Sequence, residues 1–95
     1  MTIIWSPQAV DDVAAAVDYL VERHADDAAR KLIDRVMTLV ERLAAEPIEG
    51  PEHVLRTGER VRGWPSPPFR VYYQRAGDTL IVLRVYDQRQ RPITK

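Results

Sequence analysis

The chain has 95 residues, no cysteine and no net charge at pH 7, with 45% hydrophobic and 29% charged residues. This length supports one modest hydrophobic core, so residues 1–95 are expected to form a single domain. The lack of cysteine excludes disulfides, thiol catalysis and thiolate metal sites. No apolar run approaches the roughly 20 residues that a membrane-spanning helix needs.

The beginning of the chain does not look like a signal peptide, because no basic residue precedes its apolar stretch MTIIW. Its two histidines, His24 and His53, lie far apart in the sequence and do not have the spacing of metal ligands. We therefore expect a cytoplasmic protein that uses no metal or other cofactor and has no membrane partner.

The charges are divided unevenly along the chain. Residues 1–50 carry five Lys or Arg and ten Asp or Glu, whereas residues 51–95 carry nine and four. One interpretation is that the basic half meets an acidic or anionic partner. The other is that acidic helices neutralise a basic sheet within the monomer. Charge counts bear on association and not on fold, so both interpretations stay open.

The first half of the chain predicts a strand followed by two helices. Residues 2–5 (TIIW) are typical of a short strand. Ser6 and Pro7 suit the cap and first position of a helix that runs to about Arg23. Its apolar stripe consists of Val10, Val13, Val17, Leu20 and Val21. A second helix is predicted from a cap at Asp26 to about Glu46, and the short connection makes the two an antiparallel hairpin.

The second half predicts a loop and three strands. The loop begins at residues 47–51, which contain two prolines and a glycine. The strands are predicted at residues 59–64, 69–75 and 79–86, with a tight turn at residues 76–78 between the last two. The order β-α-α-β-β-β indicates an α+β fold. In it, the helical hairpin packs on one face of a small, mainly antiparallel sheet.

Alternation along the last two strands predicts which side chains face the helices. Val71, Tyr73, Ile81, Leu83 and Val85 are expected to face the helices. Leu80 and Val82 are expected on the opposite, open face, together with two arginines and two tyrosines: Arg70, Tyr72, Arg84 and Tyr86. Arg89 and Arg91 follow the last strand, in a tail that we expect to be mobile.

The sequence contains no recognisable catalytic pattern, neither a glycine-rich phosphate loop nor an informative Ser/His/Asp arrangement, so the catalytic residues are unknown. Arginine binds phosphates and carboxylates through two donors, and tyrosine stacks on bases or fills protein pockets. Each of these side chains could equally be an ordinary exposed residue. The candidate target-binding residues are Arg70, Tyr72, Arg84, Tyr86, Arg89 and Arg91.

Three segments resemble the RelE/ParE superfamily of toxins from bacterial toxin–antitoxin modules. They are WSPQAVDDVAAAVDYL at residues 5–20, PFRVYY at residues 68–73 and GDTLIVLRVYDQRQRP at residues 77–92. Together they span nearly the whole chain. The resemblance implies the same β-α-α-β-β-β fold that the periodicity predicts.

The resemblance is stronger to the ParE-like branch, through W-S-P-x-A-x-x-D, P-[YF]-R-[IV]-x-Y and L-R-V-x-[HD]-x-x-R. It implies a toxin of a type II module, of the kind linked to plasmid stabilisation, that inhibits DNA gyrase by binding and not as an enzyme. The alternative is a RelE-like ribosome-dependent mRNA endonuclease, in which Arg70 and Arg84 would hold the phosphate and Arg89 or Arg91 would stabilise developing charge. The chain departs from that branch because no tyrosine follows Tyr86. A third possibility is an inactive homologue that retains only antitoxin binding.

The resemblance also implies a partner. A cognate antitoxin, ParD-like or RelB-like and encoded by an adjacent gene, would neutralise the toxin in a hetero-oligomer. Large apolar side chains near the ends of elements are candidates for antitoxin binding, namely Trp5, Tyr19 and Trp64. The alternative for Trp5 and Trp64 is an ordinary place in the core.

Overall fold

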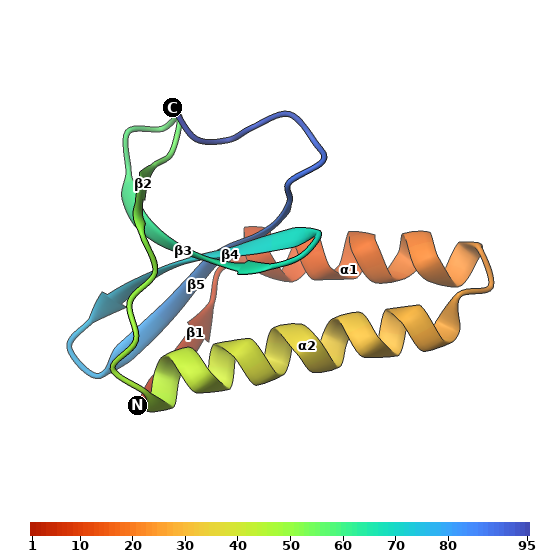
Figure 1. Ribbon diagram of the computed structural model, residues 1–95, viewed down its shortest axis with the longest axis horizontal. Coiled ribbons are helices and arrows are strands. Elements are labelled where there is room, and N and C mark those ends of the chain that lie inside the picture. The colour runs from red at the N-terminus through yellow and green to blue at the C-terminus, as the bar shows by residue number, and fades with distance from the viewer.

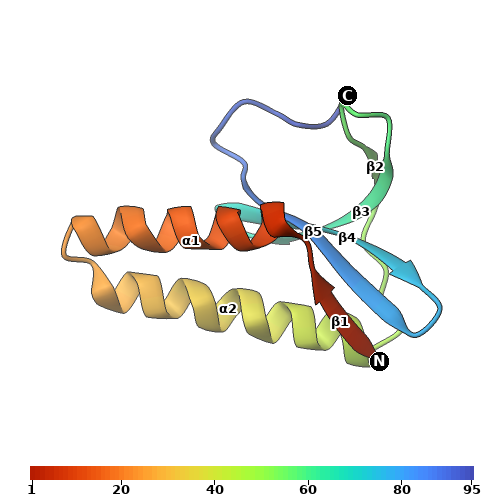
Figure 2. The ribbon, with the colours of Figure 1, turned by 180° about the vertical axis from the view of Figure 1, so that it is seen from behind.

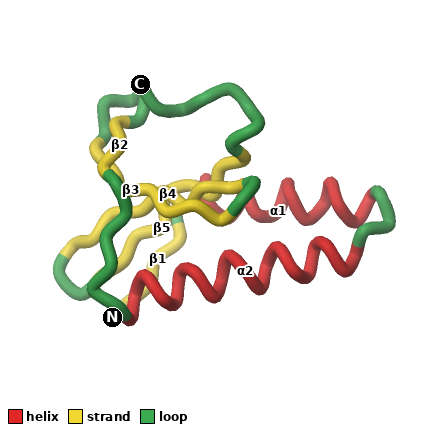
Figure 3. The backbone as a smooth tube through the Cα atoms, viewed as in Figure 1, coloured by secondary structure: helices red, strands yellow, loops and turns green.

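Two helices pack against a five-stranded sheet in the computed structural model, which describes residues 1–95 (Figures 1 and 3). The elements are β1 (Thr2–Trp5), α1 (Pro7–Glu22), α2 (Asp26–Ala45), β2 (Glu52–Val54), β3 (Arg60–Ser66), β4 (Phe69–Ala76) and β5 (Thr79–Asp87). This arrangement confirms the predicted α+β fold. It adds one strand, β2, in the segment that was predicted as a loop, because three residues are too few for a recognisable alternation.

Local chemistry determines where α1 begins and ends. Ser6 is the N-cap, and its Oγ accepts a hydrogen bond from the Ala9 amide at 3.0 Å, while Pro7 occupies the first turn. The helix ends at Glu22, just before His24 adopts the positive φ of 59°. These features confirm the predicted start and place the end within a residue of the prediction.

The predicted cap of α2 is wrong. Asp26 is the first helical residue, and Ala25, which precedes it, offers no side chain for capping. Asp26 and Asp27 instead lie in the first turn, where their carboxylates favour the positive end of the helix dipole. Neither helix combines the length and the apolar composition that would let it cross a membrane.

The strands are ordered β1-β5-β4-β3-β2, with β1 parallel to β5 and every other pair antiparallel. Gly77, at φ 57°, forms the predicted tight turn between β4 and β5. Because β1 pairs only with residues 79–82, the second half of β5 has no neighbouring strand on that side. The beginning of α1 covers this part of β5 instead.

A bulge in β5 makes part of the predicted face assignment wrong. Tyr72 pairs with Arg84, but Tyr73 pairs with Val82, so Leu83 is an extra residue in the ladder. Before the bulge, Leu80 and Val82 face the helices and are fully buried, whereas they were predicted on the opposite face. After it, Val85 returns to the helix side as predicted. Simple alternation cannot anticipate this shift.

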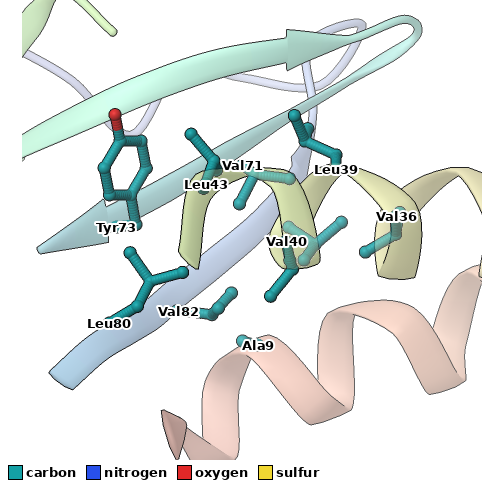
Figure 4. Packing of buried hydrophobic residues seen from close by; sticks show 10 residues of the cluster. Ala9, Val36, Leu39, Val40, Leu43, Val71, Tyr73, Leu80 and Val82 are labelled. Atoms are coloured by element: carbon teal, nitrogen blue, oxygen red, sulfur yellow. The ribbon is translucent and has the colours of Figure 1, made fainter. Parts of the chain in front are cut away.

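The main core lies between the helices and the sheet (Figure 4). Leu43 and Val40 of α2 pack on Tyr73, Leu80 and Val82 of the sheet. Figure 4 shows these side chains converging from α2 above β5, with α1 approaching through a small residue. The hydroxyl of Tyr73 accepts a hydrogen bond from the Gly50 amide at 2.8 Å, which ties the segment after α2 to the core.

The apolar stripe predicted for α1 is only partly buried. Ala9 is fully buried and Val13 packs beside the core, whereas Val10 and Val21 are 52% and 47% exposed. The buried side of α1 is therefore rotated from the predicted stripe toward Ala9. Short alanine side chains let α1 lie close to the sheet, and valines remain on its outer side.

The sheet face away from the helices was predicted to be open, but part of it is covered. Tyr72 is only 4% exposed and packs with Leu55 and Val61 in a second small cluster. Ile93, from the C-terminal tail, covers this cluster. This face therefore has its own core, built from Leu55 after β2, from β3, β4 and β5, and from the tail.

The C-terminal tail is anchored, which corrects the prediction of a mobile segment. The Arg56 amide donates to the Ile93 carbonyl at 2.7 Å, and the Lys95 amide donates to the Val54 carbonyl at 2.8 Å. Thr94 bridges Leu55 in antiparallel fashion. Figure 1 shows the tail leaving β5 and returning to the end of β2 as a closed ring.

Candidate protein-interaction site

A groove of about 650 Å³ lies between the helical hairpin and the end of β5. Both helices contribute to one wall, and the turn between β3 and β4 and the start of the tail contribute to the other. In Figure 2 the helices extend well beyond the strands, so the sheet lies beside only the N-terminal part of α1 and the C-terminal part of α2. A ligand of this chain would therefore meet the hairpin and the sheet together.

The floor of the groove is apolar and made largely of small residues. Ala15, Ala16 and Ala28 leave room between the helices, and Leu20, Leu32 and Phe69 supply larger apolar surface. A groove of this kind accepts apolar side chains from a partner helix or extended segment.

The rim of the groove is cationic. Lys31 and Arg35 border it from α2, four residues apart and therefore on one side of that helix, and Arg89 borders it from the tail. Lys31 and Arg35 have no ion-pair partner, whereas Arg89 forms an ion pair with Asp87 at 2.7 Å. The groove thus offers unpaired positive charge beside apolar surface.

Tyr19 lies at the mouth of the groove and is 55% exposed. The guanidinium of Arg23 stacks on its ring, with Cζ 3.5 Å from the ring centroid, and donates to the Tyr19 carbonyl. This cation–π contact holds the Tyr19 ring in place. Binding of a partner would therefore cost little side-chain entropy at Tyr19. Tyr19 is therefore an exposed aromatic anchor beside the basic rim.

Arg84 lies on the predicted sheet face, where it pairs with Tyr72 across the strands and its Cζ is 5.3 Å from the Tyr86 ring centroid, but its guanidinium is not free. Its guanidinium donates two hydrogen bonds to the Asp12 carboxylate of α1, at 2.8 and 2.9 Å, and the Val85 amide donates to the same carboxylate at 3.0 Å. The hydrogen bonds to Asp12 raise the pKa of Arg84, while burial lowers it. Asp12 therefore satisfies the unpaired edge of β5, and Arg84 locks α1 to the sheet.

Ser6 continues this edge lock. Its amide donates to the Val82 carbonyl at 2.9 Å, and its hydroxyl donates to the Leu83 carbonyl at 2.7 Å. Ser6 and Asp12 thus replace the strand that is missing beside the second half of β5. Because Ser6 and Asp12 satisfy this edge, the end of β5 has a defined position relative to the groove.

Asp87 and Arg89 form a local turn after β5. Arg89 donates to the Asp87 carboxylate from its backbone amide, at 2.9 Å, and from two guanidinium nitrogens, at 3.0 and 2.7 Å. The hydrogen bonds from the Arg89 side chain lower the pKa of Asp87. The turn fixes the direction of the exposed Arg89 guanidinium, while Arg91 is exposed in the tail beyond it.

Arg70 lies on the sheet face opposite the helices, beside His53 of β2. The Arg70 Nη1 atom is 3.3 Å from His53 Nε2, and its Nε is buried without a hydrogen-bond partner. Burial, and then the charge of Arg70, lower the pKa of His53. Gly63 makes room for both, because a Cβ atom there would come within 2.9 Å of His53 and 3.0 Å of Arg70.

Two tyrosines, Tyr72 and Tyr86, also lie on the sheet face away from the helices. The Tyr72 ring meets His53 edge to face at 5.5 Å, and burial raises the pKa of Tyr72. Tyr86 is half-buried, and its hydroxyl donates to the Arg91 carbonyl of the tail. The predicted target-binding residues therefore fall into two groups. The four strand residues share the sheet face away from the helices, where Arg84 is paired with Asp12 and Tyr72 and Tyr86 contact the tail, whereas Arg89 and Arg91 are exposed in the tail.

The predicted antitoxin-binding residues are also separated. Trp5 of β1 and Trp64 of β3 are half-buried beside the main core, and only Tyr19 reaches the groove. Trp64 borders a smaller hollow of about 370 Å³ that shares Arg35 with the groove. The sequence reasoning missed Lys31 and Arg35 as rim residues, although their spacing on one side of a helix was a usable signal.

The family model for the ParE toxin of type II toxin–antitoxin system, parDE, matches residues 3–92. The chain belongs to the ParE toxin family. It therefore shares the toxin assignment of that family, as the resemblance of its three segments predicted. No curated protein matches the chain significantly.

A solved structure supports the fold of this ParE-family chain. It is described as the chromosomal ParDE toxin–antitoxin system from P. aeruginosa, and it matches with a TM-score of 0.74 and 22% sequence identity. The match covers 92% of this chain and 95% of the other. At that identity the likeness establishes the architecture of two helices on a mixed sheet.

Proposed function

We propose that this ParE-family chain is a toxin that inhibits DNA gyrase by binding and is neutralised by a cognate antitoxin. The observation that carries the proposal is the family match over residues 3–92, since ParE-like sequences are the branch associated with gyrase. The mechanism would be occupation of a surface on the target and would require no chemical step by the toxin.

The position of Arg84 favours binding over mRNA cleavage. In the RelE-like alternative, Arg70 and Arg84 would hold one phosphate together. Here Arg84 is engaged by Asp12 of α1 at the edge of the sheet, while Arg70 contacts His53 of β2. Using both on one phosphate would require breaking the lock between α1 and β5.

For the target, we propose the exposed part of the chain that follows β5. Arg89 and Arg91 carry unburied guanidinium groups on a tail that is anchored at both ends. An anchored loop loses less conformational entropy on binding than a free tail does. Arg70, Tyr72 and Tyr86 would support this loop from below, and Arg84 would hold the end of β5 in place.

For the antitoxin, we propose an acidic amphipathic segment that occupies the groove. Its apolar side chains would fill the alanine-lined floor, and its carboxylates would meet Lys31, Arg35 and Arg89. Tyr19 would be an anchor residue, as aromatic side chains commonly are at interfaces. Trp64 would extend the contact along α2, whereas Trp5 would act only by supporting β1. The resulting complex would be a hetero-oligomer.

Tightly controlled expression in a bacterial host tests the proposal. We expect growth arrest accompanied by induction of the DNA-damage response, and we expect co-expression of the neighbouring antitoxin gene to restore growth. Early arrest of translation with cleaved transcripts would instead establish the nuclease alternative. Normal growth would indicate the inactive homologue.

A variant pair connects this experiment to the structure. Arg89→Ala combined with Arg91→Ala should abolish growth arrest, because it removes the exposed guanidinium groups from the tail. The matched control is Arg56→Ala, which removes an exposed arginine from the turn after β2. If both variants remain equally toxic, the tail is not the target-binding surface.

A further inference from the structure

The outer side of the helical hairpin carries a continuous apolar strip that no part of the chain covers. Seven large apolar side chains are strongly exposed, and four of them are Val10, Val21, Ile33 and Met37, between 40% and 52% exposed. All four belong to the two helices. In Figure 2, no strand or loop passes in front of the middle turns of either helix.

Helical spacing places these residues on one side of each helix. Val10, the half-buried Val17 and Val21 are seven and four residues apart, and Ile33 and Met37 are four apart. The positions that line the groove toward the sheet, such as Ala15 and Tyr19 of α1 or Lys31 and Arg35 of α2, lie on the opposite side of the helical wheel. The two apolar rows therefore border the outer side of the seam between α1 and α2.

A row of unpaired carboxylates flanks this strip on each helix. Asp11, Asp18 and Glu22 each directly follow one of the three valines, so they form a parallel row one step around α1. On α2, Asp34 directly follows Ile33, and Glu41 lies four residues after Met37, so both flank the apolar row. All five carboxylates are exposed, and none of them forms an ion pair within the chain.

We propose that this outer face binds a basic amphipathic helix of another protein. The strip supplies apolar surface along the seam of two helices, and the carboxylate rows on both sides select Lys and Arg flanking the apolar side of the incoming helix. The groove described above has the opposite charge, so the two surfaces select different segments. The proposal does not depend on gyrase being the target.

A second copy of the chain fits this face poorly. Packing two hairpins through their strips would bring the carboxylate rows of one copy against those of the other. Facing rows of like charge oppose association, and no basic row is present on this side to offset them. The only arginine near the strip, Arg30, already lies 3.9 Å from Asp27.

Two designed peptides test the proposal on the full chain. Both are about 20 residues long with leucines at heptad spacing, but one has lysines at the flanking positions and the other has glutamates. Fluorescence anisotropy should show saturable binding of the lysine peptide alone. A double variant, Ile33→Gln with Met37→Gln, should weaken that binding at least tenfold; both positions are exposed, and circular dichroism checks that the fold is retained.

The control variant is Ile4→Gln, which replaces an equally exposed apolar residue on β1 and should leave peptide binding unchanged. A third variant, Asp18→Asn with Asp34→Asn, should weaken binding and reduce its dependence on salt. The proposal is overturned if the lysine peptide does not bind, if all variants bind it alike, or if the glutamate peptide binds equally well. A dimer of the wild-type chain in light scattering that Ile33→Gln with Met37→Gln dissociates would assign the face to a second copy instead.

Discussion

The lock between α1 and β5 should contribute a large share of the stability of this chain, and Asp12→Ala tests it. The Asp12 carboxylate accepts hydrogen bonds from two nitrogens of Arg84 and from the Val85 amide. The side chains of Asp12 and Arg84 are only 16% and 28% exposed. The substitution would therefore leave a mostly covered guanidinium and a backbone amide without their acceptor.

The expected loss follows from those contacts. Removing one partner of a buried ion pair costs about 3–5 kcal/mol, and a single hydrogen bond to a charged group contributes about 1.5–3 kcal/mol. Because this pair is partly covered, we expect a loss of about 2–4 kcal/mol from a total of about 5–15 kcal/mol. For a domain of this size, that lowers the melting temperature on the order of 10–20 °C.

Urea unfolding monitored by circular dichroism measures this loss. The matched control is Asp11→Ala, which removes a neighbouring carboxylate that is exposed and unpaired, and should change the unfolding free energy by no more than about 0.5 kcal/mol. The double variant Asp12→Ala with Arg84→Ala should be less destabilised than the sum of the single variants. If Asp12→Ala is no more destabilising than Asp11→Ala, the lock does not exist in solution.

Three further predictions concern His53, Gly50 and Ile93. Burial and the charge of Arg70 lower the pKa of His53, so the unfolded chain takes up a proton there more readily than the folded chain. The unfolding free energy is therefore unaffected by this group above about pH 6.5 and decreases as the pH falls below that value. Urea unfolding at about pH 7.5 and about pH 5.5 should show a lower unfolding free energy at the lower pH in the wild type, and a smaller difference in His53→Gln. Equal differences in the two proteins would refute the role of His53. Gly50→Ala should cost about 3 kcal/mol or more, since its Cβ would lie 2.0 Å from the Gly63 carbonyl oxygen, and a melting temperature equal to wild type would contradict the close approach. Ile93→Ala should lower the unfolding free energy by about 1–2 kcal/mol in the same assay, and an unchanged value would mean that the tail is not docked.

Local signals in the sequence were sufficient for most of the fold. Ser6 and Pro7 mark the start of α1, and Gly77 marks the tight turn between β4 and β5. These features depend on contacts only a few residues apart. For the same reason they agree with the structure.

The errors occurred where distant segments meet. The bulge at Leu83 depends on pairing between β4 and β5, and no alternation within one strand reveals it. The anchoring of the tail depends on Ile93 finding Leu55, 38 residues earlier in the chain. The groove forms because the helices extend beyond the strands. This difference in extent becomes visible only when the elements are assembled. The arginines and tyrosines were identified as a set, but their separate surroundings could not be read from the sequence.

A supercoiling assay with purified DNA gyrase tests the central claim most directly. We predict that the purified chain inhibits supercoiling of relaxed plasmid, that Arg89→Ala with Arg91→Ala raises the inhibitory concentration at least tenfold, and that Arg56→Ala leaves it unchanged. In a cell-free translation reaction the same protein should leave the mRNA intact. Undiminished supercoiling together with cleaved mRNA on ribosomes would contradict the account.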